Sequence, residues 1–246
     1  MGQPTRPRRL TVPSGRVSLA ALVLAAHVLT WQGVVDLTTL HGDAAPLARR
    51  WPVAAAVGRL EGTVTRPDRR ATRTTERYQS STGESRDVQD VPAIVYIVGP
   101  VPGARSQPLA RLELAQRGEA FRPELVVVPV GATVSFPNGD PLFHNVFSYS
   151  RARRFDLGRY PRGESKTVVF DKPGYVKVLC EVHKWMRAGI LVVDNPFHAV
   201  VQESGRFQID DVPAGRYRVA VETFERRAQA EVQIPEGGTA TVTFAP

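Results

Sequence analysis

The sequence predicts an all-β protein, and three features of the 246-residue chain support this prediction. Short alternating or β-branched segments recur at close spacing from residue 58 to the end. Glycine and proline, 20 of each, interrupt these segments in turn-forming clusters. No long segment beyond residue 58 repeats its apolar residues with the period of a helix. Many short strands separated by turns are typical of β-sandwiches.

The N-terminal segment predicts export. Residues 1–16 are polar and basic, and residues 17–29 form an apolar run. A basic region before an apolar run of this length is typical of a secretory signal. The alternatives are an uncleaved signal anchor that extends to residue 37 and a buried N-terminal core helix. We therefore interpret residues 1–44 as a signal peptide or signal anchor with a spacer. The body is expected in the periplasm, or anchored facing it, with membrane contact only if the anchor is retained.

The main body is predicted to be one β-sandwich domain at residues 58–195. Residues 60–65 alternate as in a strand, and residues 91–98 form a β-branched strand that stops at a Gly-Pro pair. Residues 66–90 between them lack large apolar side chains, so we expect a mobile surface insertion there. Further strands are predicted at residues 125–130, 132–136, 145–149, 165–170, 174–179 and 189–193.

A second group of alternating segments follows residue 196. It predicts a small β-module at residues 196–246, with strands at 198–202, 206–209, 216–223, 228–234 and 239–244. A module this short buries little surface by itself. We expect it to pack on the main sandwich, or to add the strand at residues 60–65 to its own sheet.

Charge and cysteine content narrow the functional classes. The formal net charge is +8, but no Lys/Arg tract is interleaved with aromatic residues, so nucleic-acid binding is not favoured. An acidic protein partner or an anionic membrane surface fits this charge. Cys180 is the one cysteine, which excludes an intramolecular disulfide. It is either a small buried hydrophobe or a metal ligand, and export favours the ligand because a free thiol is reactive in an oxidising compartment.

A cluster of metal-binding residue types surrounds this cysteine. Cys180, His183 and Met186 form a Cys-x2-His-x2-Met motif. A thiolate, an imidazole and a thioether suit a copper ion that alternates between Cu(I) and Cu(II). His144 is the best candidate for a second imidazole, because it follows a Pro/Gly/Asn/Asp turn and precedes a predicted strand.

Three neighbouring residues have supporting roles in this interpretation. Asn145 would bridge the two ligand-bearing loops by hydrogen bonds, or else serve as a turn residue. Phe143 and Trp185 would form an apolar collar that excludes water, a role compatible with ordinary packing. The imidazole edge of His183 is expected to face solvent and to act as the port for electrons.

At these residues the sequence resembles the cupredoxins, with the Cys-x2-His-x2-Met spacing of amicyanin. The segment 131–138 and the His144-Asn145-Val146 sequence are similar to the cupredoxin region that leads to the first histidine ligand, so the resemblance covers roughly residues 121–193. It implies a Greek-key sandwich and one type 1 (blue) copper ion. The implied equatorial ligands are His144, Cys180 and His183, with Met186 axial. The insertion at 66–90 and the charged residues Glu181 and Lys184 depart from the family pattern.

Residues 199–219 are similar to the carboxypeptidase regulatory-like module, a small transthyretin-like β-sandwich. They carry a Gly-x-Phe-x-Ile and a Val-Pro-x-Gly-x-Tyr motif. Together the two parts resemble exported bacterial proteins described as methylamine-utilisation-like.

These observations favour an electron carrier that exchanges single electrons with a redox protein partner. An acidic partner would dock on a basic face formed by Arg151, Arg153, Arg154, Arg159 and Arg162, although the same arginines would also suit a simple solvated edge. The alternatives are a copper carrier or sensor, and an adhesion or scaffold protein that uses its C-terminal module. An enzyme is not expected, because a Cys180–His183 pair lacks a third orienting group.

Overall fold

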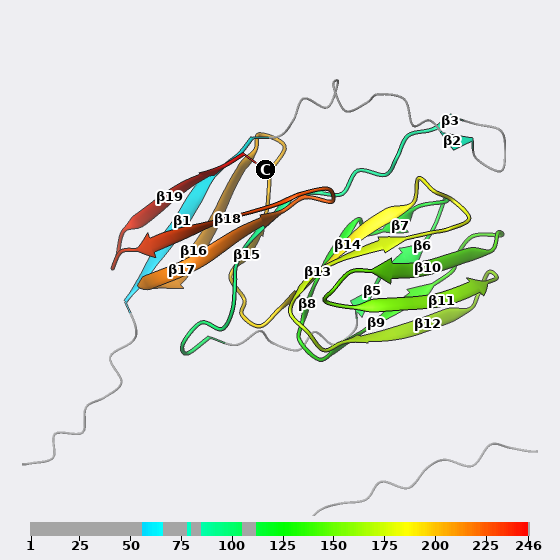
Figure 1. The fold of residues 1–246 in the computed structure, drawn as a ribbon, viewed down its shortest axis with the longest axis horizontal. Coiled ribbons are helices and arrows are strands. Elements are labelled where there is room, and N and C mark those ends of the chain that lie inside the picture. The colour runs from blue at the N-terminus through cyan, green and yellow to red at the C-terminus, as the bar shows by residue number, and fades with distance from the viewer. Residues whose placement is uncertain (1–55, 66–77, 80–84, 105–111, 246) are drawn as a thin grey trace, which may run out of the picture. The chain divides into compact units, whose positions relative to one another are not determined.

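The computed structural model describes residues 56–65, 78–79, 85–104 and 112–245 (Figure 1). Every regular element within these ranges is a strand, which confirms the all-β prediction for them. The predicted signal or anchor segment and most of the predicted insertion at 66–90 lie outside the described residues. No helix in the described part of the chain is long and apolar enough to cross a membrane.

Residues 112–193 form a first sandwich of two sheets. The larger sheet contains, in spatial order, β11 (Arg154–Tyr160), β10 (His144–Tyr149), β13 (Gly174–Leu179), β14 (Arg187–Val193) and β8 (Leu125–Pro129). The smaller contains β12 (Ser165–Phe170), β9 (Ala132–Pro137) and β5 (Leu112–Glu113). The short strands β6 (Ala115–Gln116) and β7 (Phe121–Arg122) form a hairpin beside them. Neighbouring strands are antiparallel except for β14 with β8 and β5 with β9.

The core of the first sandwich follows from strand alternation. In β13, Val176 and Val178 are fully buried while the residues on either side are partly exposed. They pack in one cluster with Phe136 and Phe170 of the facing sheet. Burying each large apolar side chain contributes about 1.5–3 kcal/mol. The same cluster includes Cys180, Trp185 and Met186, so the segment after β13 folds back onto the core.

A second sandwich combines strands from both ends of the described chain. One sheet has the order β16 (Arg206–Pro213), β1 (Val57–Val64) and β19 (Thr239–Phe244). The other has the order β15 (His198–Val200), β4 (Ile94–Ile97), β17 (Gly215–Glu222) and β18 (Arg227–Ile234). A second hydrophobic cluster contains residues from both sheets, among them Leu60, Val95, Phe207 and Val219. The strands β2 (Tyr78–Gln79) and β3 (Ser85–Arg86) pair with each other.

The predicted boundary between domains at 58–195 and 196–246 does not match this strand pairing. β1 pairs antiparallel with β16 and parallel with β19 (Figure 1). β4 lies between β15 and β17 in the other sheet. The physical reason is the small size of the C-terminal module, whose strands need Leu60 and Val95 to complete a core. Gly62 allows the close approach of β1 to β19, because a Cβ there would overlap the Val242 carbonyl oxygen. The first sandwich is therefore inserted between β4 and β15 of the second.

Two strands are buried on both faces. In β14, Ile190 and Val192 belong to the core of the first sandwich, whereas Leu191 and Val193 join a third cluster. That third cluster also contains Ile94, Tyr96 and Ala220, which come from β4 and β17. All four residues of β4 are buried for the same reason.

Candidate metal centre

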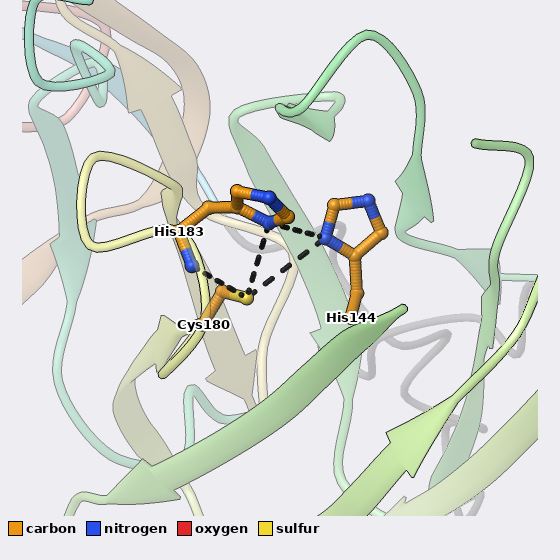
Figure 2. Close-up of side chains that lie close together, drawn as sticks. All are labelled: His144, Cys180 and His183. Atoms are coloured by element: carbon orange, nitrogen blue, oxygen red, sulfur yellow. Dashed lines mark hydrogen bonds between the residues drawn. The ribbon is translucent and has the colours of Figure 1, made fainter. Parts of the chain in front are cut away.

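Three potential metal ligands converge at one end of the larger sheet of the first sandwich. His144, Cys180 and His183 are all buried, and their ligand atoms lie within 4.8 Å of one another (Figure 2). The two Nδ1 atoms are 2.9 Å apart. The Cys180 sulfur lies 3.9 Å from Nδ1 of His144 and 4.0 Å from Nδ1 of His183.

This triangle has the size of a metal site. A point equidistant from its three corners lies about 2.1 Å from each, given the three separations. Metal–nitrogen and metal–sulfur bonds in protein sites of this kind are about 2.0–2.3 Å long. The three donors could therefore hold one copper ion with little movement. Two imidazoles and one thiolate in a trigonal arrangement are the donor set of electron-transfer copper sites.

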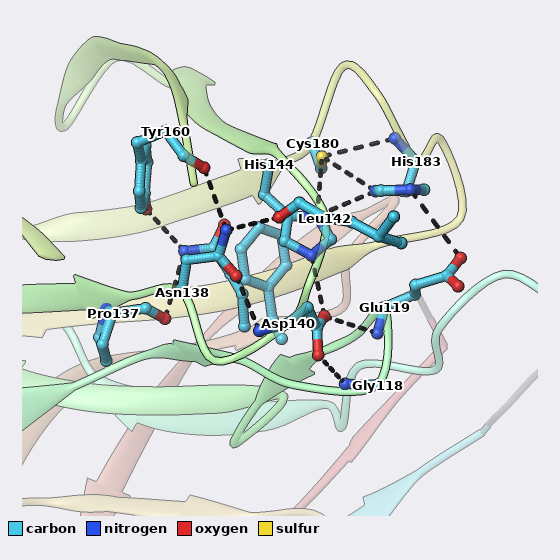
Figure 3. A network of polar contacts seen from close by, with 12 residues as sticks. Gly118, Glu119, Pro137, Asn138, Asp140, Leu142, His144, Tyr160, Cys180 and His183 are labelled. Carbon is cyan, nitrogen blue, oxygen red and sulfur yellow. Dashed lines mark hydrogen bonds and ion pairs between the residues drawn. The ribbon is translucent and has the colours of Figure 1, made fainter. Parts of the chain in front are cut away.

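A hydrogen-bonded turn sets the position of His144 at the start of β10. The Asn138 side chain donates to the Leu142 and Tyr160 carbonyl oxygens at 2.8 and 3.0 Å (Figure 3). Its Oδ1 accepts the Asp140 N–H at 2.9 Å. Asn138 is 2% exposed, so these bonds are shielded from water and fix the turn that precedes the ligand.

The loop between β13 and β14 supplies the other two donors. Cys180 follows the last residue of β13, which pairs with Phe147 of β10 and so brings the two ligand-bearing strands together. The His183 N–H faces the Cys180 sulfur at 3.4 Å, and the Met186 N–H donates to the His183 carbonyl at 2.9 Å. Met186 is fully buried beside the site, and its thioether ligation stays a prediction.

Asn145 joins the two ligand-bearing segments. Its Oδ1 accepts the Glu181 N–H at 3.3 Å, one residue beyond Cys180, and its Nδ2 donates to Asp156 at 2.7 Å. The side chain is 3% exposed. It therefore links the residue after Cys180 to the residue after His144, a contact that the predicted bridging role requires.

Asp140 orients the imidazole of His144. Its Oδ2 lies 2.8 Å from Nε2, so an Nε2–H would donate to the carboxylate and leave Nδ1 free to bind a metal. The carboxylate also accepts the N–H groups of Gly118 and Glu119 at 2.6 and 2.9 Å. Burial acts to raise the pKa of Asp140, but these hydrogen bonds and His144 outweigh it and hold the pKa below its usual value.

The imidazole of His183 is covered, so the predicted solvent-facing edge is wrong. Its side chain is only 6% exposed, and its Nε2 lies 3.9 Å from Oε2 of Glu119. The ring of Trp185 packs against it at a centroid distance of 5.0 Å, and the indole N–H donates to the Glu119 carbonyl at 2.9 Å. Burial, with a smaller contribution from His144, lowers the pKa of His183 and favours the neutral form that binds metals.

The two aromatic residues of the predicted collar differ in environment. Trp185 is 6% exposed and shields the site, whereas Phe143 is 57% exposed. Glu181 and Lys184 are exposed on the ligand loop. The Glu181 carboxylate lies 3.7 Å from the guanidinium of Arg159.

The sequence interpretation missed three residues at the site. The first is Asp140, four residues before a ligand, a spacing that was visible in the turn but received no role. Glu119 had no local signal, because it lies far from the ligand motif in sequence. The third is Gln89, within the predicted mobile insertion: its N–H donates to the Trp185 carbonyl at 2.9 Å and its carbonyl accepts from Arg187 at 2.6 Å. This end of the insertion packs against the ligand loop.

No protein-family model and no curated protein matches the chain. Among solved structures, a copper-containing nitrite reductase from Thermus scotoductus matches 41% of this chain and 26% of its own, with 24% identity and a TM-score of 0.34. A purple cupredoxin from Nitrosopumilus maritimus matches 33% of this chain and 99% of its own, with 22% identity and a TM-score of 0.31. A Cu(I) amicyanin variant matches 40% of this chain and 98% of its own, with 17% identity and a TM-score of 0.32.

Proposed function

We propose that the first sandwich binds one type 1 copper ion and carries single electrons between redox proteins. The observation that supports this most directly is the buried triangle of His144, Cys180 and His183. The copper ion would supply the one-electron chemistry. The protein would supply two neutral imidazoles, a thiolate and a site from which water is excluded.

Copper fits this donor set better than zinc does. A structural zinc site usually has four nitrogen, sulfur or carboxylate ligands, and a thioether is a poor substitute for one of them. Met186, buried on the same loop, is suited to the long axial position of a copper site. The hydrogen bonds at Asn138, Asn145 and Asp140 would keep the ligands in place when the charge on the metal changes, which favours rapid electron exchange.

The proposed partner is an acidic redox protein that docks on the arginine-rich edge beside the ligand loop. Arg159 on the edge strand β11 approaches Glu181, next to Cys180. Arg154 begins the same strand, at the end away from His144, and lies over the ring of Tyr149, which is 66% exposed. Exposed tyrosine and arginine side chains are common at the energetic centres of interfaces. Export to the periplasm, with or without a membrane anchor, is part of this proposal and rests on residues 1–29.

A visible spectrum tests the copper assignment. The purified protein is titrated with Cu(II) and compared with Cys180→Ser, which removes the thiolate but keeps a side chain of similar size. We expect an intense thiolate-to-copper band that bleaches on reduction and returns on oxidation, and no such band in the variant. A colourless protein that binds Cu(I) tightly would indicate a copper carrier instead. Wild-type protein without copper binding would refute the assignment and favour the scaffold alternative.

A further inference from the structure

We propose that Glu119 is a positioning residue for His183 and that its carboxylate lowers the reduction potential of the copper site, an inference that rests on the proposed function. The carboxylate lies at the Nε2 edge of the ring, whereas Nδ1 is the atom that would bind the metal. His183 directs Nδ1 toward Cys180 and His144, whereas its Nε2 lies 3.9 Å from Oε2 of Glu119 (Figure 3). This separation is within ion-pair range but longer than a hydrogen bond.

The backbone of Glu119 is fixed from several directions. Its N–H donates to Oδ2 of Asp140, and its carbonyl accepts the indole N–H of Trp185. It lies in the tight connection of the β6–β7 hairpin, where the Arg117 N–H donates to the Ala120 carbonyl at 2.9 Å. Glu119 has a positive φ of 52°, which is uncommon for a residue with a Cβ. The turn therefore fixes the backbone from which the Glu119 side chain reaches the Nε2 edge of the His183 ring.

Solvent screens the Glu119 carboxylate only weakly. The side chain of Glu119 is 9% exposed and that of His183 is 6% exposed. Charges separated by protein interior interact more strongly than charges separated by water, and dissolved salt weakens the interaction between buried charges less. A fixed carboxylate on the far side of a ligating imidazole increases the electron density that the ring offers to the metal.

The two histidines thus have matching partners. Asp140 lies 2.8 Å from Nε2 of His144, and Glu119 approaches Nε2 of His183. Negative charge beside both imidazoles stabilises Cu(II) relative to Cu(I), because the oxidised ion carries one more positive charge. The structure thus points to a site with a lower reduction potential than the same ligands would have beneath a neutral covering residue.

Redox titration of the copper-loaded full-length chain tests this role. Glu119→Gln removes the charge and keeps the shape. Glu181→Gln is the matched control, because it removes the same charge from a side chain that is 66% exposed on the ligand loop. We expect Glu119→Gln to raise the potential more than Glu181→Gln does. High salt should diminish the effect of Glu181→Gln and leave most of the effect of Glu119→Gln, a pattern that a purely structural defect would not produce.

Two further variants keep the test decisive. Glu119→Met is a second charge-free side chain of similar length, and it should raise the potential in the same direction even if the glutamine variant folds poorly. Glu119→Asp keeps the charge and should stay closer to the wild type. Equal shifts in Glu119→Gln and Glu181→Gln, with the visible band intact, would overturn the role of Glu119 and leave the proposed function standing. A wild-type protein without redox-active copper would overturn both.

Discussion

Replacement of Asn145 by alanine should weaken both the fold and the copper site. The change removes the acceptor for the Glu181 N–H at 3.3 Å and the donor to Asp156 at 2.7 Å. Each such bond contributes about 0.5–1.5 kcal/mol net, so the free energy of unfolding of the metal-free protein should fall by about 1–3 kcal/mol. The loss leaves the backbone after Cys180 without its tie to β10.

A second effect should appear only when copper is bound. Loss of a side chain that orients metal ligands costs about 10- to 100-fold in metal affinity, which corresponds to about 1.4–2.7 kcal/mol. Because copper stabilises the folded state according to its affinity, the increment in stability that copper gives should shrink by that amount. Urea unfolding of the metal-free and the copper-loaded protein, each with and without the substitution, measures both effects.

Asn195→Ala provides the matched control. Asn195 is 1% exposed and donates to the Ile97 and Gly99 carbonyl oxygens at 2.9 and 2.7 Å, while its Oδ1 accepts the Phe197 N–H at 2.9 Å. Its loss should destabilise the protein without changing the increment from copper. If copper stabilised the Asn145 and Asn195 variants by the same amount as the wild type, Asn145 would not organise the ligands.

Two further predictions concern the axial position and a buried carboxylate. Met186→Leu keeps the volume of a fully buried side chain, so the free energy of unfolding should change by less than about 1.5 kcal/mol. The reduction potential of the copper-loaded protein should rise, and an unchanged potential would exclude axial ligation by Met186. Glu222 accepts a hydrogen bond from the Tyr96 hydroxyl at 3.2 Å and pairs with Arg227, and burial raises its pKa. The protonated carboxyl therefore stabilises the fold at a pH below the unfolded pKa of Glu222, and this stabilisation is lost as pH rises through the folded pKa. Urea unfolding of Glu222→Gln should therefore show less loss of stability than the wild type as pH rises above about 4.5, and parallel pH profiles would contradict this.

The ligands could be predicted from the sequence because their placement is mostly local. Cys180, His183 and Met186 lie on one short loop after an alternating strand, so their proximity needs no knowledge of the rest of the fold. His144 required one long-range assumption, that its strand neighbours the strand before Cys180. The pairing of Phe147 with Leu179 meets that assumption.

The covering of His183 and the choice between the two expected arrangements of β1 could not be predicted in this way. Glu119 reaches the site only because the β6–β7 hairpin folds over the ligand loop, and nothing in its flanking residues indicates a charge near a metal. For β1, the alternation at residues 60–65 specifies a strand with one buried face. It carries no information on which strands will flank it, because any half-buried neighbour satisfies the same pattern. The sequence left two options, that the C-terminal module packs on the main sandwich or that it adds this strand to its own sheet, and the pairing of β1 with β16 and β19 confirms the second.

The insertion of one sandwich within the other has a consequence for synthesis on the ribosome. β4 is buried along its whole length, yet its neighbours β15 and β17 begin only at His198 and Gly215. At roughly 5–20 residues per second, β17 would be translated about 6–24 s after β4. Until β15 emerges, the nascent chain carries an apolar strand with two unpaired edges, which invites chaperone binding or misassociation. The metal-binding half can finish folding first, and the strands that flank it in sequence close around their own core only when the last segments emerge.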